Sequence, residues 1–336
     1  MIKRILISFA AVCILAGCYD DYLRDFDYTA AYITYQYDLR TFVAGEGECF
    51  NLPVALAGVM VNDMERSYDV VLDNSLCSAD LSSFGEKIEP FTAMDGMLGT
   101  APIGTLAGGS GSYVTTELKA SGVNALEPLP SDYYTLDFSG IKIKKGYVTA
   151  SATIKATRKF FEDPKSYGPY YAIGYKINKA DVDSLCKDRS FAVVAVKAEN
   201  KFFGNWYHGG RSVTGSDVIE YPFSIPQDDG KVYTITTVDA NTVRTDKYVQ
   251  NKGSLILTFN GDDLTITSDE VKLLPDSRKS GFNGAKLLQD RQLYLNYTYE
   301  DAKGRAIQVS DTLYFRNRIR DGINEWQDTE KEHYTI

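Results

Sequence analysis

Short runs in which apolar and polar residues alternate recur from residue 30 almost to the C-terminus. The clearest run is Ile141-Lys142-Ile143-Lys144, which lies between turn signals at Ser139-Gly140 and Lys145-Gly146. A period of two is typical of strands that bury one face. The other strand-length runs of the first half are 31–37, 50–57, 68–73, 133–138, 148–156, 170–177 and 191–198. This pattern predicts an immunoglobulin-like antiparallel β-sandwich over residues 30–200.

Two parts of the first half depart from the strand pattern. Residues 78–130 contain two stretches with the composition of loops, Gly99-Thr100-Ala101-Pro102-Ile103-Gly104 and the Gly- and Ser-rich residues 108–112. Because a structureless loop of this length is uncommon in a compact domain, we interpret it as an insertion between two sandwich strands. We expect it to have its own hairpin around Tyr113–Leu118. Asn178 followed by residues 179–187 predicts one short helix, with Asn178 as its N-cap.

A second series of strand signals follows residue 200. Asn260-Gly261 and Asp301-Ala302-Lys303-Gly304 are strong hairpin signals within it. Eight consecutive runs, at 203–213, 218–224, 231–238, 242–245, 254–259, 264–268, 292–299 and 306–316, fit an up-and-down barrel over residues 201–320. Residues 321–336 are polar, and we expect an irregular tail there. The sequence therefore predicts an all-β protein, a sandwich followed by a barrel.

The first residues have the features of a secretion signal. Lys3 and Arg4 precede an apolar run from Ile5 to Leu15, which is too short to span a membrane. The run ends in Leu15-Ala16-Gly17-Cys18, the pattern of a bacterial lipobox. We therefore predict a signal peptide at 1–17, lipidation of Cys18 and a lipidated tether at 18–29. Two acyl chains would give stable anchoring in the outer membrane without a spanning helix.

Composition and charge favour β structure and argue against nucleic-acid binding. The chain has 24 Tyr, 16 Phe and two Trp, a composition that favours strands. The formal net charge is −9, and removal of Lys3 and Arg4 takes it to −11. An acidic chain without clustered Lys and Arg is not expected to bind nucleic acid. Of the five cysteines, Cys13 is removed with the signal peptide and Cys18 is lipidated, which leaves Cys49, Cys77 and Cys186 as thiols. At most one disulfide can form among these three, and buried free thiols are the other interpretation.

Catalytic and metal-binding patterns are absent from the sequence. A nucleophilic triad needs a base, yet His208 and His333 have no recognisable partner motif. The acidic turns at Gln227–Gly230 and Gly261–Asp263 do not have the spacing of calcium loops. No Gly-rich loop leads into a helix to cradle phosphate. We therefore predict no enzyme activity, no cofactor and no metal.

Aromatic side chains in loops are the remaining candidates for ligand contacts. Sugars present apolar ring faces with polar edges, which suit aromatic platforms beside amides and carboxylates. The candidate ligand-binding residues are Trp326, Tyr167, Tyr170, Tyr171 and Tyr113. For each of them, packing against its own domain is the alternative interpretation.

Several features of the first half resemble a known bacterial module when they are taken in order. They include Leu52-Pro53-Val54, residues 68–73, Leu129-Pro130-Ser131-Asp132-Tyr133-Tyr134 and Ile143-Lys144-Lys145-Gly146. This half resembles the N-terminal domain of unknown function in Bacteroidetes polysaccharide-utilisation lipoproteins, which also precedes endo-β-N-acetylglucosaminidase-type glycosidases. Asp20-Asp21 behind Cys18 resembles the surface-export signal of such lipoproteins. The resemblance implies display on the cell surface.

The second half is similar to the companion domain of that module and looks calycin-like. Gly204-Asn205-Trp206 resembles the lipocalin Gly-x-Trp motif, and Arg316 lies in the last predicted strand. The resemblance implies that Arg316 packs over the Trp206 indole and closes one end of the barrel.

Three hypotheses of function follow. The first is a non-catalytic, outer-membrane surface lipoprotein that binds glycan for a polysaccharide-utilisation system. The second is a structural or adhesive lipoprotein that contacts another protein, such as an outer-membrane uptake complex. The third is a lipocalin-like carrier, but apolar inward positions in the last strands predict a filled barrel, namely Leu255, Leu257, Phe259, Leu293, Leu295 and Tyr297.

Overall fold

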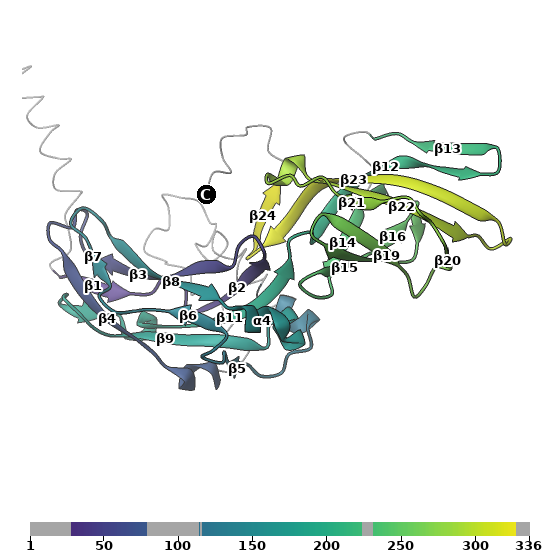
Figure 1. Ribbon diagram of the computed structural model, residues 1–336. Coiled ribbons are helices and arrows are strands. Elements are labelled where there is room, and N and C mark those ends of the chain that lie inside the picture. Colours follow the sequence, from purple (N-terminus) through teal and green to yellow (C-terminus); the bar gives the residue numbers. More distant parts are fainter. Residues whose placement is uncertain (1–27, 79–113, 115, 224–230, 327–336) are drawn as a thin grey trace, which may run out of the picture.

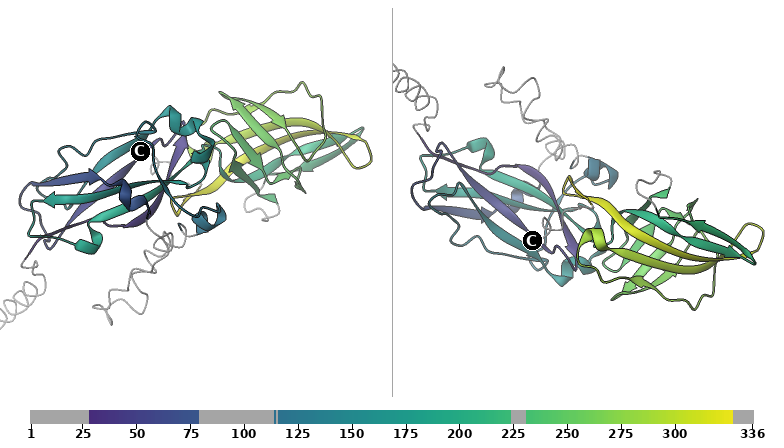
Figure 2. Two further views of the ribbon diagram at one scale, coloured as in Figure 1. Left: turned by 90° about the horizontal axis from the view of Figure 1, so that it is seen from below. Right: turned by 90° about the horizontal axis from the view of Figure 1, so that it is seen from above.

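The computed structural model describes residues 28–78, 114, 116–223 and 231–326. This part of the chain is built almost entirely of strands, which confirms the all-β prediction. Two β regions follow one another along the chain and lie end to end, a sandwich and then a barrel (Figure 1). The two further views in Figure 2 show the same elongated arrangement.

The sandwich consists of two sheets. One has the order β10 (Ser184–Leu185), β1 (Ala30–Tyr32), β3 (Cys49–Ala57), β8 (Thr149–Ala156) and β6 (Tyr134–Leu136). The other has the order β2 (Tyr37–Ala44), β11 (Phe191–Asn200), β9 (Tyr171–Ala180), β4 (Arg66–Leu72) and β7 (Lys142–Ile143), with β5 (Glu127–Pro128) paired to β9. Most pairs are antiparallel, whereas β1–β10, β2–β11 and β5–β9 are parallel.

The central strand β9 explains how the sandwich core is organised. Tyr171, Ile173 and Tyr175 point into the space between the two sheets, where they join a cluster with Phe42 and Ile154. Successive residues of a strand point to opposite faces, so the apolar residues of β9 on the outer face need other apolar side chains to bury them. A smaller apolar cluster covers that outer face, with Leu39, Cys77, Val114, Leu118, Val123, Leu126, Ala172, Val193 and Ala195. The first part of β9, from Tyr171 to Tyr175, is therefore buried on both faces.

Two local predictions in this half are wrong. Strand β9 continues to Ala180 instead of giving way to a helix capped by Asn178, and only a short 3-10 turn, η5 (Lys187–Arg189), follows later. The side chain of Asn178 donates to Asp69 Oδ2 on the neighbouring β4 at 2.7 Å, so it braces strands and caps nothing. Residues 116–120 are helical where we expected a hairpin. Most of the predicted insertion, residues 79–113, lies outside the described residues.

The remaining short helical elements lie in the connections between strands. They are η1 (Asn74–Ser78), α4 (Arg158–Glu162), η4 (Pro164–Tyr167) and η7 (Leu288–Asp290). Phe160 of α4 is fully buried against Phe42, which fastens this connection onto the sandwich core.

Eight strands close the barrel, because β12 pairs with both β14 and β23. Their order is β12 (Gly204–Thr214), β14 (Tyr233–Thr237), β15 (Thr242–Thr245), β18 (Ile256–Asn260), β19 (Asp263–Thr267), β21 (Ser280–Phe282), β22 (Gln292–Glu300) and β23 (Ala306–Arg320). The predicted strand at 218–224 appears as β13 (Asp217–Tyr221), which pairs with β12 outside the closed ring. Strand β21, which the sequence did not indicate, takes its place.

The barrel interior is filled with apolar side chains, as the sequence predicted. Trp206, Leu257, Leu293 and Phe315 are fully buried and belong to one cluster. Three short additions complete this half: β20 (Leu273–Leu274), the hairpin β16 (Lys247–Tyr248) with β17 (Asn251–Lys252), and β24 (Ile323–Trp326). The prediction of an irregular tail is wrong for its first part, because β24 pairs with β23.

A cluster of charges joins the sandwich to the barrel. Glu46, in the turn between β2 and β3, contacts Arg318 of β23 at 2.6 Å and Arg291 at 2.9 Å. The two arginine side chains are only 1% and 5% exposed. Arg318 also pairs with Glu325 of β24 at 2.5 Å, and its guanidinium lies 5.0 Å from the Phe203 ring centroid. We call Glu46, Arg291, Arg318 and Glu325 the junction cluster.

Candidate functional site

The structure does not bring the predicted aromatic residues together into one platform. Tyr171 is buried in the sandwich core, and its hydroxyl donates to Asp163 Oδ2 at 2.6 Å. Tyr167 donates to the carbonyl of Phe161, and Tyr170 packs against the outer cluster of β9. Trp326 lies in β24, and Tyr113 lies outside the described residues. Packing within the domain accounts for the three tyrosines that the structure describes.

Trp206 is a core residue, but Arg316 does not cover it. The indole is fully buried, donates to the carbonyl of Phe202 at 3.1 Å and meets the Phe315 ring edge-on. The guanidinium of Arg316 lies instead over the ring of Tyr207, 5.6 Å from its centroid. Successive residues on a strand face opposite sides, so Arg316 and Tyr207 lie on the outer face while Phe315 and Trp206 face inward. The predicted cation–π closure is therefore wrong.

The three cysteines of the described chain are free thiols. Cys77 is fully buried, its Sγ lies 3.5 Å from the carbonyl of Ala172, and burial raises the pKa of the thiol. Cys49, at the start of β3, is exposed, so the expectation of buried thiols is wrong for this residue. Cys18 lies outside the described residues.

We expect a maleimide reagent to label Cys49 in the native protein and Cys77 only after unfolding. The thiolate is the reactive form, and burial of Cys77 disfavours it while blocking access. Mass spectrometry of the labelled native and denatured chains measures both sites. The variant Cys49→Ser should lose the native-state label at this site, and rapid native labelling of Cys77 would contradict the prediction.

An open groove on the sandwich is the best candidate for a ligand site. It has a volume of about 420 Å³ and lies between β4, the end of β9 and the turn at Phe138–Gly140. Its lining comprises Ser67, Tyr68, Asp69, Val70, Phe138, Ser139, Gly140, Lys179, Ala180 and Asp181. The lining residues therefore carry two carboxylates, one ammonium group, three hydroxyls and two aromatic rings around one small space. Volumes of this order are typical of small-ligand sites.

Local irregularities in the strands create this groove. The pairing of β4 with β9 shifts register between Asp69 and Val70, which is the mark of a β-bulge. Asp69 is held by Asn178, and Asp181 accepts from the backbone amide of Ser67 at 3.0 Å. These hydrogen bonds fix the carboxylates while leaving them exposed.

Phe138 supplies the aromatic side of the groove. Its ring stacks on the buried Tyr175 ring at 5.6 Å between centroids and 26° between planes, and Phe138 is itself only half-buried. Burial raises the pKa of the Tyr175 hydroxyl well above its ordinary value, so the side chain beneath Phe138 is neutral. Sequence reasoning missed the groove because Asp69 and Asp181 are far apart in the chain and the bulge has no glycine to mark it.

A second polar cluster lies inside the barrel. His208 Nε2 lies 2.9 Å from Asp311 Oδ1, and both side chains are fully buried. The His208 ring stacks on Tyr233 at 4.9 Å, and the Tyr297 hydroxyl donates to Asp311 Oδ2 at 3.4 Å. Burial raises the pKa of Asp311, while contact with His208 opposes the shift. The sequence offered no partner motif for His208, because Asp311 lies far from it along the chain.

A strained turn covers this cluster. Val249 and Gln250, which connect β16 and β17, have positive φ angles of 45° and 63°, and Val249 is a β-branched residue that disfavours this conformation. The side-chain amide of Gln250 lies 3.3 Å from His208 Nδ1, and its backbone amide donates to the Tyr233 hydroxyl. Full burial of His208 and Asp311 makes the pair a structural element of the barrel.

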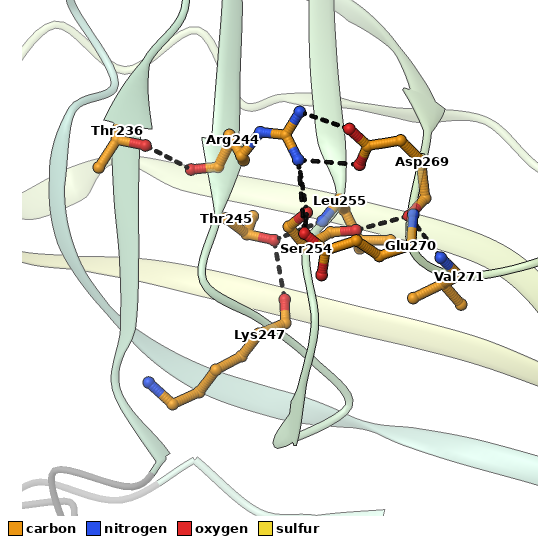
Figure 3. A network of polar contacts seen from close by, with 10 residues as sticks. Thr236, Arg244, Thr245, Lys247, Ser254, Leu255, Asp269, Glu270 and Val271 are labelled. Carbon is orange, nitrogen blue, oxygen red and sulfur yellow. Dashed lines mark hydrogen bonds and ion pairs between the residues drawn. The ribbon is translucent and has the colours of Figure 1, made fainter.

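A third polar network lies on the barrel exterior (Figure 3). Arg244 of β15 makes a bidentate ion pair with Asp269, at 2.8 and 2.9 Å, and donates to the hydroxyl of Ser254. Ser254 in turn donates to Glu270 at 2.9 Å. The side chains pair with one another across β15, the segment before β18 and the segment after β19 (Figure 3), so the network fastens neighbouring parts of the barrel together.

The described residues contain no group of three His, Cys, Asp or Glu side chains positioned to hold a metal ion. In the same part of the chain, no helix combines the length and apolar character needed to cross a membrane.

Comparisons with known proteins relate the chain to bacterial β proteins. The model of a family described as an N-terminal domain matches residues 110–184. No curated protein matches the chain. A solved structure from Bacteroides ovatus, of unknown function, has 20% identity and a TM-score of 0.58, and the match covers 90% of this chain and 98% of that one. This likeness shows a shared fold.

Two further solved structures resemble the chain less closely. An auxiliary nutrient binding protein from Bacteroides thetaiotaomicron has 14% identity and a TM-score of 0.38, with 87% of this chain and 95% of that one covered. A multidomain protein including DUF1735 from Bacteroides ovatus has 12% identity and a TM-score of 0.40, with coverage of 89% and 100%. The first of these proteins is described by a binding role and the second by a domain of unknown function.

Proposed function

We propose that the protein is a non-catalytic lipoprotein, anchored in the outer membrane through Cys18 and displayed on the cell surface, where it binds glycan for a polysaccharide-utilisation system. The groove of the sandwich carries this proposal. Phe138 offers a ring for the apolar face of a sugar, while Asp69, Asp181 and Lys179 offer hydrogen-bonding groups for its hydroxyls. The lipobox and the acidic residues behind Cys18 support the location.

The groove suits binding better than catalysis. Asp69 and Asp181 are exposed and held by hydrogen bonds from Asn178 and Ser67, which suits them to accept further hydrogen bonds from hydroxyls. Glycoside hydrolysis needs one carboxyl that is held protonated to act as the acid, and a buried, apolar setting favours this. Both carboxylates of the groove are instead exposed.

A glycan array followed by affinity electrophoresis tests the proposal. The mature chain should be retarded by at least one plant or host polysaccharide. The double variant Asp69→Asn with Lys179→Ala should weaken binding about thirtyfold, because two hydrogen bonds are lost and each is worth about 1 kcal/mol. Both positions are exposed, so the fold should tolerate the changes. Phe138→Ala should weaken binding as well, and its thermal unfolding must be measured because Phe138 packs on Tyr175.

The matched control is Tyr294→Ala, which removes an exposed aromatic ring from the barrel and should leave the affinity unchanged. If no glycan retards the wild-type chain, glycan binding is wrong. If a glycan binds but the groove variants bind it equally well, the site lies elsewhere on the protein.

A second candidate function is an adhesive lipoprotein that contacts another protein. Strand β13 favours it, because Val218 and Ile219 are exposed and β13 pairs only with β12 among the residues that the structure describes. An edge strand with apolar side chains can pair with a strand of a partner. Capture of an uptake-complex component by the wild-type chain, lost in Ile219→Lys, would favour this function over glycan binding.

A further inference from the structure

One end of the sandwich combines exposed apolar side chains with the point where the described chain begins. Val61, Met64, Tyr147 and Val148 are 71%, 49%, 64% and 42% exposed. Together with Lys144 and Lys145, we call these residues the apolar tip. Single exposed apolar residues are ordinary, whereas a group of four on adjacent loops marks an interaction surface.

Hydrogen bonds join the two loops of the apolar tip into one surface. The amide of Gly146 donates to the carbonyl of Asn62 at 2.8 Å, and the side chain of Asn62 donates to the carbonyl of Lys144 at 3.1 Å. Arg66 in turn donates to Asn62 Oδ1 at 3.0 Å. Asn62 is only 1% exposed, so a buried amide braces the loops while their apolar side chains point outward.

The chain enters the fold at this same end. The carbonyl of Tyr28 lies so close to Gly58 that a Cβ there would be 2.1 Å from it, and Gly58 begins the loop that carries Val61 and Met64. The adjoining Thr29 exchanges hydrogen bonds with Asp183 at 2.7 to 3.1 Å. In Figure 1, β1 and β7 lie at the end of the molecule farthest from β13.

We propose that the apolar tip rests on the lipid surface of the membrane in which Cys18 is anchored. This inference depends on the proposed lipidation. Cys18 lies ten residues before Tyr28, so the tether can extend at most about 35 Å, and the apolar tip is where it joins the fold. Val61 and Met64 enter the headgroup region, and Tyr147 occupies the interface, where tyrosine is favoured.

Charge at the apolar tip is compatible with a lipid surface. Lys144 and Lys145 are exposed, and Lys142 nearby is paired with Glu65 at 2.7 Å. This region therefore has three lysines and two carboxylates, those of Asp63 and Glu65, whereas the protein as a whole is acidic. Lysine side chains close to an anionic lipid surface are attracted to it. The groove lies close by, because Arg66 also donates to the carbonyl of Asp181, so a bound glycan would lie near the membrane.

The test uses the full-length chain, made in a host that processes lipoproteins and reconstituted into vesicles of phosphatidylcholine and phosphatidylglycerol. Cys49 and Cys186 are changed to serine, and the buried Cys77 is left in place. A polarity-sensitive fluorophore is attached at Tyr147→Cys or, as the matched control, at Tyr294→Cys on the barrel. Both parent residues are exposed tyrosines.

The fluorophore at position 147 should emit at shorter wavelength in vesicles than in detergent-free buffer, and brominated acyl chains should quench it. The fluorophore at position 294 should change in neither respect. Introducing Val61→Ser and Met64→Ser should remove most of the shift at position 147 without unfolding the protein, because both side chains are exposed.

The outcomes separate this inference from the anchor on which it depends. If Cys18→Ser abolishes incorporation into vesicles while position 147 of the anchored chain stays in a water-like environment, the anchor holds and the lipid contact is wrong. If incorporation does not require Cys18, the proposed lipidation is wrong. If position 147 is shielded only in native outer membranes and not in pure lipid, a protein partner covers the tip and the lipid contact is again wrong.

Discussion

Replacing Glu46 with alanine should lower the free energy of unfolding by about 3 kcal/mol, near the lower end of the range for breaking a buried ion pair from one side. Glu46 neutralises both Arg318 and Arg291, whose side chains are almost fully buried. Without it, Arg318 keeps Glu325, but Arg291 loses its nearest carboxylate. Chemical denaturation of the variant and the wild type measures the loss.

The same change should uncouple the two halves of the protein. Glu46 belongs to the sandwich, while Arg291 and Arg318 belong to the barrel, so the junction cluster joins two separate apolar cores. We expect calorimetry to resolve two unfolding transitions in Glu46→Ala that lie closer together in the wild type. The control, Glu65→Ala, breaks an exposed pair with Lys142 and should have little effect on either transition. Equal effects of the two variants would contradict the role of the junction cluster.

The junction cluster also predicts a dependence on pH. Burial disfavours ionisation of Glu46, but the charges and hydrogen bonds of Arg318 and Arg291 outweigh it and hold the pKa of Glu46 below its ordinary value. The folded state therefore binds the proton less tightly than the unfolded state does. Stability from Glu46 is complete above the ordinary glutamate pKa of about 4.3 and is lost as the pH falls through the lower folded value. Glu46→Gln should lack this acid-dependent loss.

The local alternation of apolar and polar residues predicted the strands of the fold. Where a local prediction failed, pairing between strands far apart in the sequence was the cause. The alternation in residues 141–144 and the turn at Asn260-Gly261 lead directly to β7 and to the β18–β19 hairpin. The helix expected after Asn178 failed because pairing with β4 extends β9 through residues with adequate local helix signals. Tertiary context overrode local preference there.

The sequence predicted the candidate site less well than it predicted the fold. Tyr167 and Tyr171 stand beside a proline in a loop-like segment, yet their hydroxyls find partners in Phe161 and Asp163 and their rings pack inward. The groove depends on a β-bulge at Asp69, and no residue type in the local sequence indicates this bulge. The buried His208 alternates in phase with the core residue Trp206 along β12, and this phase is the signal that could have identified it.

Replacing Asp311 with leucine should destabilise the protein by about 3–5 kcal/mol, because it leaves His208 without its carboxylate partner in a buried position. His208→Phe should cost a similar amount, since Asp311 would then be a buried carboxylate supported only by the long hydrogen bond from Tyr297. Equilibrium denaturation, followed by the intrinsic fluorescence of the barrel, measures the free energy of unfolding of both single variants and of the double variant.

The double variant distinguishes a mutually stabilising polar pair from two unrelated core positions. If His208 and Asp311 stabilise each other, the combined change should cost much less than the sum of the single changes, because an apolar pair replaces a buried polar pair without leaving one polar partner alone. Additive costs would show that the pair does not interact.

The dependence of stability on pH that Asp311 causes is opposite in direction to that of Glu46. Burial raises the pKa of Asp311, so its ionisation in the fold costs stability as the pH rises through the ordinary aspartate range toward the raised value. Asp311→Asn should remove that decline while keeping the shape of the side chain, and an unchanged pH profile would refute the assignment to Asp311.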